Sequence, residues 1–333
     1  MNILFVSSLR IGDAVLSTGL LAYFSEGFPE VRSAIACGPL PAPIFAHAPC
    51  GERVIALHKR SFAGHWLGLW TEVVGTAWDL VVDLRGSALS WTLWAKKRRV
   101  FRWVDYTIQH GESLGRFFAL DEPPALRIWW SATEEAFAAK NIGDGSPVLA
   151  LGPTANWAGK IWLAQRFTAL LGRLAGADSI FPDGRIAVFG AAGERNIVLP
   201  VLQAIPPERC INQVGTVDIL TAATCLNNCD LFVGNDSGLM YMAAAIGTPH
   251  PRVVWAQRGS SLCALGPALR GRRNRHPLCG AGWASRFGSP DNKIADDQPF
   301  RRPGRWRRRG FMAPDRTQII MAGILHTILA LVA

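Results

Sequence analysis

The sequence predicts an α/β fold made of two similar halves. Short runs rich in β-branched residues alternate with segments of helical period over roughly the first 250 residues, as in βαβ units that build a parallel sheet. A cluster of Gly, Asp, Ser and Pro at 141–147 interrupts this alternation, and the same pattern then restarts. We therefore expect one domain at 1–145 and a second at 146–249, with a ligand cleft between them.

Both halves begin with a strand and continue in alternation. In the first half, strand candidates lie at 2–6, 32–37, 53–57, 79–84 and 98–104, and a helix at 14–28 follows the first strand. In the second half, strands at 148–153, 185–190 and 230–235 are combined with helices at 162–175, 194–205, 217–228 and 239–247. Open parallel sheets bind ligands at the carboxyl ends of their strands, so polar residues that follow the strands are the candidate site residues.

The basic charge of the chain is confined to one segment. The net charge is +10, but thirteen Arg and one Lys against three Asp give residues 250–312 alone a charge of +11. The rest of the chain is close to neutral, which argues against a protein that binds nucleic acid over its whole surface. The seven Cys form no paired CxxC framework, so neither disulfides nor a structural zinc site is expected. Cys225 and Cys229, on an apolar helical stretch, are expected to be buried small residues.

Asp13 follows the first strand in "SSLRIGDAVLSTG" (7–19), together with Arg10 and Gly12. Because a helix begins there, its carboxylate can cap that helix by accepting hydrogen bonds from the free amides of the first turn. The alternative is catalysis by a polar group presented at the carboxyl end of a strand. The residue pattern alone favours capping.

Two charged residues lie at the start of helices in the second half. Lys160, in "LGPTANWAGKIWLAQRF" (151–167), lies beside the positive end of a helix dipole, and an anionic ligand there would remove the conflict. Its alternative is a solvated surface lysine. Glu194, in "AVFGAAGERNI" (187–197), can accept hydrogen bonds from ribose hydroxyls or stabilise its own helix without a ligand. The pattern leaves both alternatives open.

The stretch "GNDSGLMYMAAAIGTP" (234–249) is the most specific motif. A strand delivers Asn235, Asp236, Ser237 and Gly238 to a turn, and an Ala-rich helix follows. The amides of Ser237 and Gly238 at a helix N-terminus suit a phosphate, and the Asp236 carboxylate suits sugar hydroxyls. A phosphorylated sugar therefore fits this turn.

Taken in order, these motifs resemble glycosyltransferase family 9, the heptosyltransferases of bacterial lipopolysaccharide core assembly. The resemblance extends over about residues 1–249 and rests on "RIGDAVLSTG", "DLVVDLRGSALS", "GPTANWAGKIW", "FGAAGERN" and "LFVGNDSGLMYMAAAIGTP". It implies a GT-B architecture, in which two Rossmann-like domains face each other across a cleft. The acceptor is then expected on the first domain and the nucleotide-sugar donor on the second.

The resemblance also implies a reaction and its residues. The reaction is inverting transfer of a sugar, heptose from ADP-heptose, to a lipid A-core saccharide at the cytoplasmic face of the inner membrane. Asp13 is implied as the general base, and the implied donor-binding residues are Thr154, Lys160, Glu194, Asp236, Ser237 and Gly238. No metal or other cofactor is expected, since no DxD pattern follows a suitable strand. Tyr241 departs from the family, which usually has His at that position.

The family pattern stops after Pro249. Where the family continues with a Gly-Pro turn and a "PWGP"-like loop, this chain has "HPRVVWAQ" and later "CALGPALRG". With codons chosen freely, a shift by one nucleotide converts these strings to "TLGLFGP" and "APWGPR". We therefore interpret 250–333 as an anomalous Arg-rich tail that follows a change of reading frame, which would leave the second domain incomplete.

Other functions remain open at this point. The stretch "RRPGRWRRRG" (301–310) is typical of binders of nucleic acid or anionic surfaces, but its charge lies in the segment that is interpreted as out of frame, so no nucleic-acid partner is expected. An inactive family member is a second alternative. A dinucleotide-dependent epimerase is disfavoured, because "SSLRIGDAVLSTG" lacks the GxGxxG pattern.

Overall fold

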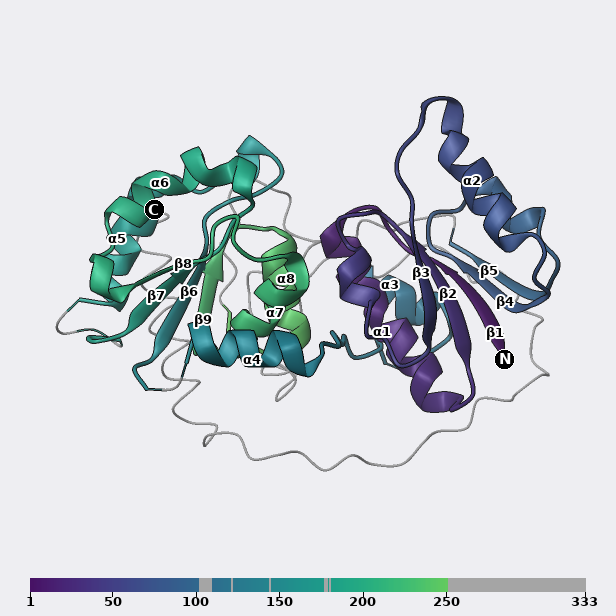
Figure 1. Ribbon diagram of the computed structural model, residues 1–333, viewed down its shortest axis with the longest axis horizontal. Coiled ribbons are helices and arrows are strands. Elements are labelled where there is room, and N and C mark those ends of the chain that lie inside the picture. Colours follow the sequence, from purple (N-terminus) through teal and green to yellow (C-terminus); the bar gives the residue numbers. More distant parts are fainter. Residues whose placement is uncertain (102–109, 121, 144, 177–178, 180, 251–333) are drawn as a thin grey trace, which may run out of the picture.

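The computed structural model describes residues 1–250, except for 102–109, 121, 144, 177–178 and 180. It confirms the α/β prediction, because two lobes lie next to each other and each contains a parallel sheet with helices packed on it (Figure 1). The Arg-rich tail and the frame change predicted for it lie outside the described residues, His250 excepted. None of the described helices combines the length and apolar character that crossing a bilayer requires.

The first lobe has a five-stranded sheet of order β3-β2-β1-β4-β5. Its elements in chain order are β1 (Asn2–Val6), α1 (Ile11–Gly27), β2 (Arg32–Cys37), η1 (Ala42–Phe45), β3 (Gly51–Ala56), η2 (Ser61–Ala63), α2 (Gly64–Val73), β4 (Trp78–Asp83), η3 (Ala88–Trp91), β5 (Ala95–Val100) and α3 (His110–Phe117). Ile3 and Phe5 pack in the cluster that contains α1, whereas Leu4 and Val6 pack in the cluster that contains α2. Because β1 is covered on both faces, its buried residues Ile3 to Val6 are all apolar.

The second lobe has a four-stranded parallel sheet of order β8-β7-β6-β9. Its elements in chain order are α4 (Ala132–Asn141), β6 (Val148–Gly152), η4 (Ala158–Lys160), α5 (Ala164–Leu174), β7 (Arg185–Val188), η5 (Ala192–Glu194), α6 (Arg195–Gln203), η6 (Pro207–Arg209), β8 (Cys210–Asn212), α7 (Ile219–Asn227), β9 (Leu231–Gly234) and α8 (Gly238–Ile246). The strands and helices expected for this half all form, with ends shifted by a few residues.

The residue pattern does not predict α2, α4 or β8. The sequence of α2, "GHWLGLWTEV", contains two Gly, which disfavour a helix, and β8 is only three residues long. A signal for α4 was present: the hydroxyl of Ser131 accepts from the amide of Thr133 at 3.1 Å, and Glu134 accepts from the amide of Ser131 at 2.8 Å. This Ser-x-x-Glu capping box starts a helix that packs against α7 of the second lobe.

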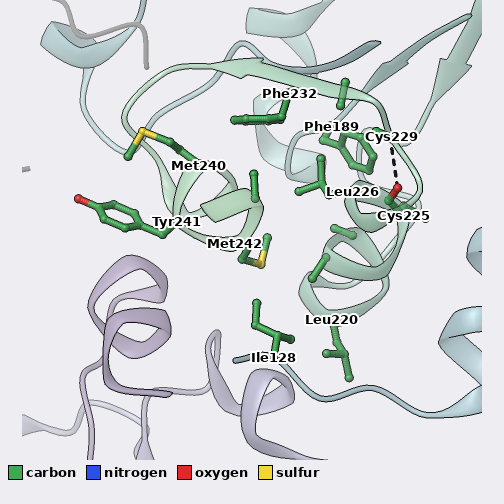
Figure 2. Packing of buried hydrophobic residues seen from close by; sticks show 14 of the residues in the cluster. Ile128, Phe189, Leu220, Cys225, Leu226, Cys229, Phe232, Met240, Tyr241 and Met242 are labelled. Atoms are coloured by element: carbon green, nitrogen blue, oxygen red, sulfur yellow. Dashed lines mark hydrogen bonds between the residues drawn. The ribbon is translucent and has the colours of Figure 1, made fainter. Parts of the chain in front are cut away.

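The two lobes are joined by the packing of α1 on α8. A Cβ added at Gly238 would lie 2.6 Å from Cγ2 of Ile11, and a Cβ added at Gly12 would lie 2.9 Å from Cδ2 of Tyr241. The first turns of the two helices therefore touch directly, and only glycine allows this approach. The ring of Tyr241, labelled in Figure 2, thus lies against Gly12 of the first lobe.

The second sheet ends at β9 within the described residues. All four residues of β9 are buried, although the strand lies at the edge of the sheet. After α8 the chain returns to this edge, where the amide of Phe232 donates to the carbonyl of Pro249 at 2.8 Å. A further parallel strand would begin with such a bond, and Pro249 is the residue after which the sequence predicts a change of reading frame.

The prediction for the two cysteines near α7 is confirmed. Cys225 and Cys229 are both buried, and the thiol of Cys229 donates to the carbonyl of Cys225 at 3.2 Å (Figure 2). Burial raises the pKa of Cys225 to about 11 and raises the pKa of Cys229 further. Both thiols are therefore protonated at neutral pH and pack as small apolar groups.

Candidate functional site

The carboxyl edge of the second sheet gathers the predicted donor-binding residues. Lys160 follows β6, Glu194 follows β7 and Asp236 follows β9. Because β6 lies between β7 and β9, these three segments are neighbours at one edge of the sheet. Thr154 is buried in the same segment as Lys160.

A buried ion pair forms the centre of this edge. The Nζ atom of Lys160 lies 2.8 Å from Oδ2 of Asp236, and the side chains are 20% and 3% exposed. The contact is an ion pair without the alignment of a hydrogen bond, and no other described group donates to either carboxylate oxygen. The surface-lysine alternative for Lys160 is therefore wrong. An anionic ligand at this lysine would compete with Asp236.

Asn235 holds the two loops of the ion pair together. Its side-chain Oδ1 atom accepts from the backbone amide of Trp162 at 3.0 Å, and its backbone amide donates to the carbonyl of Gly152 at 3.0 Å. Asn235 and Trp162 are both buried. The sequence motif placed Asn235 in the turn but indicated no role for it. A polar residue at the end of an apolar strand was a signal for this structural role.

The first turn of α8 has free polar groups. Ser237 is the N-cap residue, but its hydroxyl makes no capping hydrogen bond, and Oγ is buried without a partner in the described part of the chain. The amides at the start of a helix are uncapped donors that favour negative charge. Together with Lys160, they provide a cluster of donors for an oxyanion.

Glu194 already serves its own helix. Its Oε2 atom accepts from the amide of Ala191 at 2.8 Å, which stabilises the turn before α6. This is the local role that the sequence allowed, and it leaves Oε1 available for a ligand. The ribose-binding role therefore stays a prediction.

Asp13 does not cap α1. The N-cap residue of α1 is Arg10, and the Oδ2 atom of Asp13 accepts instead from the hydroxyl of Ser8 at 3.3 Å. The same hydroxyl accepts from the amide of Arg10 at 3.2 Å. The capping interpretation is therefore wrong, because Asp13 points back to the loop after β1. Its helix turn is the one that touches the first turn of α8 through Ile11 and Gly12.

The segment that contains these loops resembles a known family in sequence. Residues 117–250 match the model of glycosyltransferase family 9 (heptosyltransferase). The match includes Lys160, Glu194 and Asp236 and ends at residue 250, next to Pro249, where the resemblance was expected to end. A curated relative, lipooligosaccharide heptosyltransferase 2 of Haemophilus influenzae, is 37% identical over 67 residues, which is 19% of this chain and 19% of the relative.

Solved structures of heptosyltransferases and of a family 9 glycosyl transferase share the fold. The family 9 glycosyl transferase of Veillonella parvula superposes with a TM-score of 0.65 at 17% identity, over 75% of this chain and 79% of that one. The ADP-heptose lipopolysaccharide heptosyltransferase II of E. coli gives a TM-score of 0.64 at 18% identity, over 80% and 88%. E. coli heptosyltransferase WaaC, solved with ADP-2-deoxy-2-fluoro heptose, gives 0.58 at 17% identity, over 79% and 92%. The predicted GT-B architecture is thereby confirmed.

Proposed function

We propose that the protein transfers a heptose from ADP-heptose to a lipopolysaccharide core saccharide, because residues 117–250 match the model of glycosyltransferase family 9 (heptosyltransferase). The observation that carries the proposal is the contact between the first turns of α1 and α8. Asp13 belongs to one turn, and Ser237 and Gly238 belong to the other. A transferase needs its base and its donor-binding groups in one place, because both act on the same anomeric carbon.

The donor diphosphate is proposed to bind between Lys160 and the first turn of α8. The ammonium supplies a full charge, and the uncapped amides with the free hydroxyl of Ser237 supply hydrogen bonds. When Lys160 contacts phosphate, Asp236 becomes available to accept hydrogen bonds from sugar hydroxyls. Glu194 is proposed to accept a hydrogen bond from a ribose hydroxyl through Oε1. Thr154 is proposed to contact the donor from the loop that carries Lys160.

The proposed reaction is a single displacement with inversion. Asp13 accepts the proton of an acceptor hydroxyl while that oxygen attacks the anomeric carbon of the heptose. The bond from this carbon to the diphosphate oxygen breaks, and the electron pair leaves with ADP. Lys160 and the α8 amides stabilise the charge that develops on the leaving group.

The experiment is an ADP-release assay with ADP-heptose and a core saccharide acceptor. Asp13→Asn should lower kcat by about 100- to 10,000-fold, because a general base contributes this much, and should leave the affinity for ADP unchanged. The matched control is Glu26→Gln, which removes one carboxylate from the exposed far end of α1. Equal kcat for Asp13→Asn and Glu26→Gln would refute the assignment of Asp13.

A lipid-linked acceptor would place the enzyme at the cytoplasmic face of the inner membrane. Trp94 is 81% exposed and is followed by β5, on which Lys97 and Arg99 are exposed. Aromatic and basic side chains on one surface favour contact with anionic lipid headgroups. Vesicles containing anionic phospholipid should co-sediment the protein, and Trp94→Ala should weaken this binding. Equal co-sedimentation with neutral vesicles would contradict the electrostatic part of the proposal.

A further inference from the structure

The loop after β4 in the first lobe is held rigidly by a buried carboxylate. Asp83 is fully buried, and its Oδ1 atom accepts from the amide of Arg85 at 2.8 Å. Its Oδ2 atom accepts from the amide and hydroxyl of Ser87, at 2.8 and 2.5 Å, and from the hydroxyl of Ser90 at 2.6 Å. Because its carboxylate accepts from four donors of this loop, Asp83 has a structural role and fixes the position of the Arg85 backbone.

The side chain of Arg85 is stacked on an aromatic ring instead of being paired with an acid. Its guanidinium carbon lies 4.7 Å from the centroid of the Trp66 ring, and its Nη1 atom is buried without a hydrogen-bond partner in the described structure. Burial lowers the pKa of Arg85, and the nearby charge of Asp83 partly offsets this effect. Arginine nevertheless stays charged, so the site holds a cation whose N–H groups are incompletely used.

A second buried nitrogen atom without a partner in the described ranges of the chain belongs to His65, the residue before Trp66. The ring of His65 is 5.2 Å from the ring of Trp66, and its Nδ1 atom is also buried without a partner among the described residues. Simple stacking of Arg85 on Trp66 would explain the position of the guanidinium. It does not explain why two side chains next to Trp66 each have a buried nitrogen atom without a hydrogen-bond partner in the part of the chain that the structure describes, since buried polar groups are rarely left unpaired.

The position of Arg85 relates this cluster to the proposed reaction site. β1 and β4 are neighbours, and Val6 is paired with Asp83. Ser8, which donates to Asp13, lies two residues beyond Val6, and Arg85 lies two residues beyond Asp83. The guanidinium and the proposed base therefore come from adjacent loops at the carboxyl edge of the first sheet.

We propose that Arg85, backed by Trp66, binds a carboxylate or phosphate group of the acceptor saccharide. The planar guanidinium matches either oxyanion through two parallel N–H donors, while its face remains on the indole ring. The term acceptor rests on the function proposed above, whereas the oxyanion site is a property of the first lobe by itself. Binding there would orient the acceptor hydroxyl toward Asp13.

The first experiment tests the site without requiring transfer activity. The full chain, labelled with ¹⁵N at the arginine Nε position, is titrated with glucose, glucuronate or glucose 6-phosphate at constant ionic strength. Arg85→Lys identifies the signal of Arg85, and the exposed Arg53, whose guanidinium donates to a backbone carbonyl, is the internal control. A saturable shift of the Arg85 signal with one or both anions, absent with glucose, supports the site and identifies the anion.

The second experiment links the site to the reaction. Arg85→Gln should raise the KM for an anionic acceptor about 10-fold or more, the effect of losing a charge-assisted pair, while the KM for ADP-heptose stays within twofold of that of Arg53→Gln. No saturable shift with either anion, or an equal shift at Arg53, overturns the oxyanion site. A saturable shift in a protein that transfers no heptose would instead refute the proposed function and leave the site intact.

Discussion

Removing the charge of Lys160 should destabilise the second lobe, because it leaves a buried carboxylate without a partner. Asp236 is 3% exposed and Lys160 is 20% exposed. Breaking a buried pair from one side costs about 3–5 kcal/mol, and the partial exposure of Lys160 places Lys160→Met near the lower end, at about 3 kcal/mol. Asp236→Asn leaves an ammonium group that can turn toward water, so its cost is about 1 kcal/mol.

A double-mutant cycle isolates the pair itself. Lys160→Met with Asp236→Asn removes both charges, so the expected cost is about 2 kcal/mol instead of the sum of about 4 kcal/mol, a coupling of about 2 kcal/mol. Urea unfolding gives the global values, and hydrogen exchange of peptides from β9 and α8 locates the loss in the second lobe. Lys140→Met, at an exposed lysine of α4, is the matched control and should change stability by less than about 0.5 kcal/mol.

The same variants separate the ligand role from the structural one. Lys160→Met should weaken binding of ADP, because the ammonium is the proposed phosphate contact. Asp236→Asn should leave ADP affinity equal or higher, because it removes the carboxylate that competes for Lys160. Costs of the two single variants that add within about 0.5 kcal/mol would refute the coupling. Equal loss of ADP affinity in both variants would refute the competition.

Three further predictions concern other parts of the chain. Gly238→Ala should cost about 1–3 kcal/mol through overpacking, because its Cβ would lie 2.6 Å from Ile11, and thermal melting should show that adding Ile11→Ala recovers part of the loss. Ser131→Ala should cost about 1 kcal/mol. The hydrogen bond from Ser131 lowers the pKa of Glu134 in the folded protein. The ionised carboxylate therefore stabilises the fold above the ordinary Glu pKa, and this stabilisation is lost as the pH falls through the lowered value. Urea unfolding at several pH values should show a dependence of the unfolding free energy on pH that Glu134→Gln lacks. The nucleotide sequence after codon 249 should encode "TLGLFGP"-like and "PWGP"-like strings in a neighbouring frame, and their absence would contradict the frame change.

The sequence alone determined the architecture and the edge of the sheet where chemistry is concentrated. Apolar runs such as 3–6 and 231–234 predicted buried parallel strands, because a strand covered on both faces has no polar alternation. Parallel strands bring their carboxyl ends to one edge, so Lys160 and Asp236 could be placed near each other without coordinates. The residue pattern did not predict short or glycine-containing elements such as α2 and β8, because their sequences have only a weak local preference for helix or strand.

Only the tertiary structure decided what each polar group contacts. Asp13 had the position of a helix cap, but the loop after β1 turns its carboxylate to Ser8. The Lys160–Asp236 pair, 76 positions apart in the sequence, depends on the packing of two loops that Asn235 holds together. The stacking of Arg85 on Trp66 likewise joins α2 to the loop after β4. Period and composition report whether a residue is buried, whereas its partners are set by long-range packing, which a local pattern does not encode.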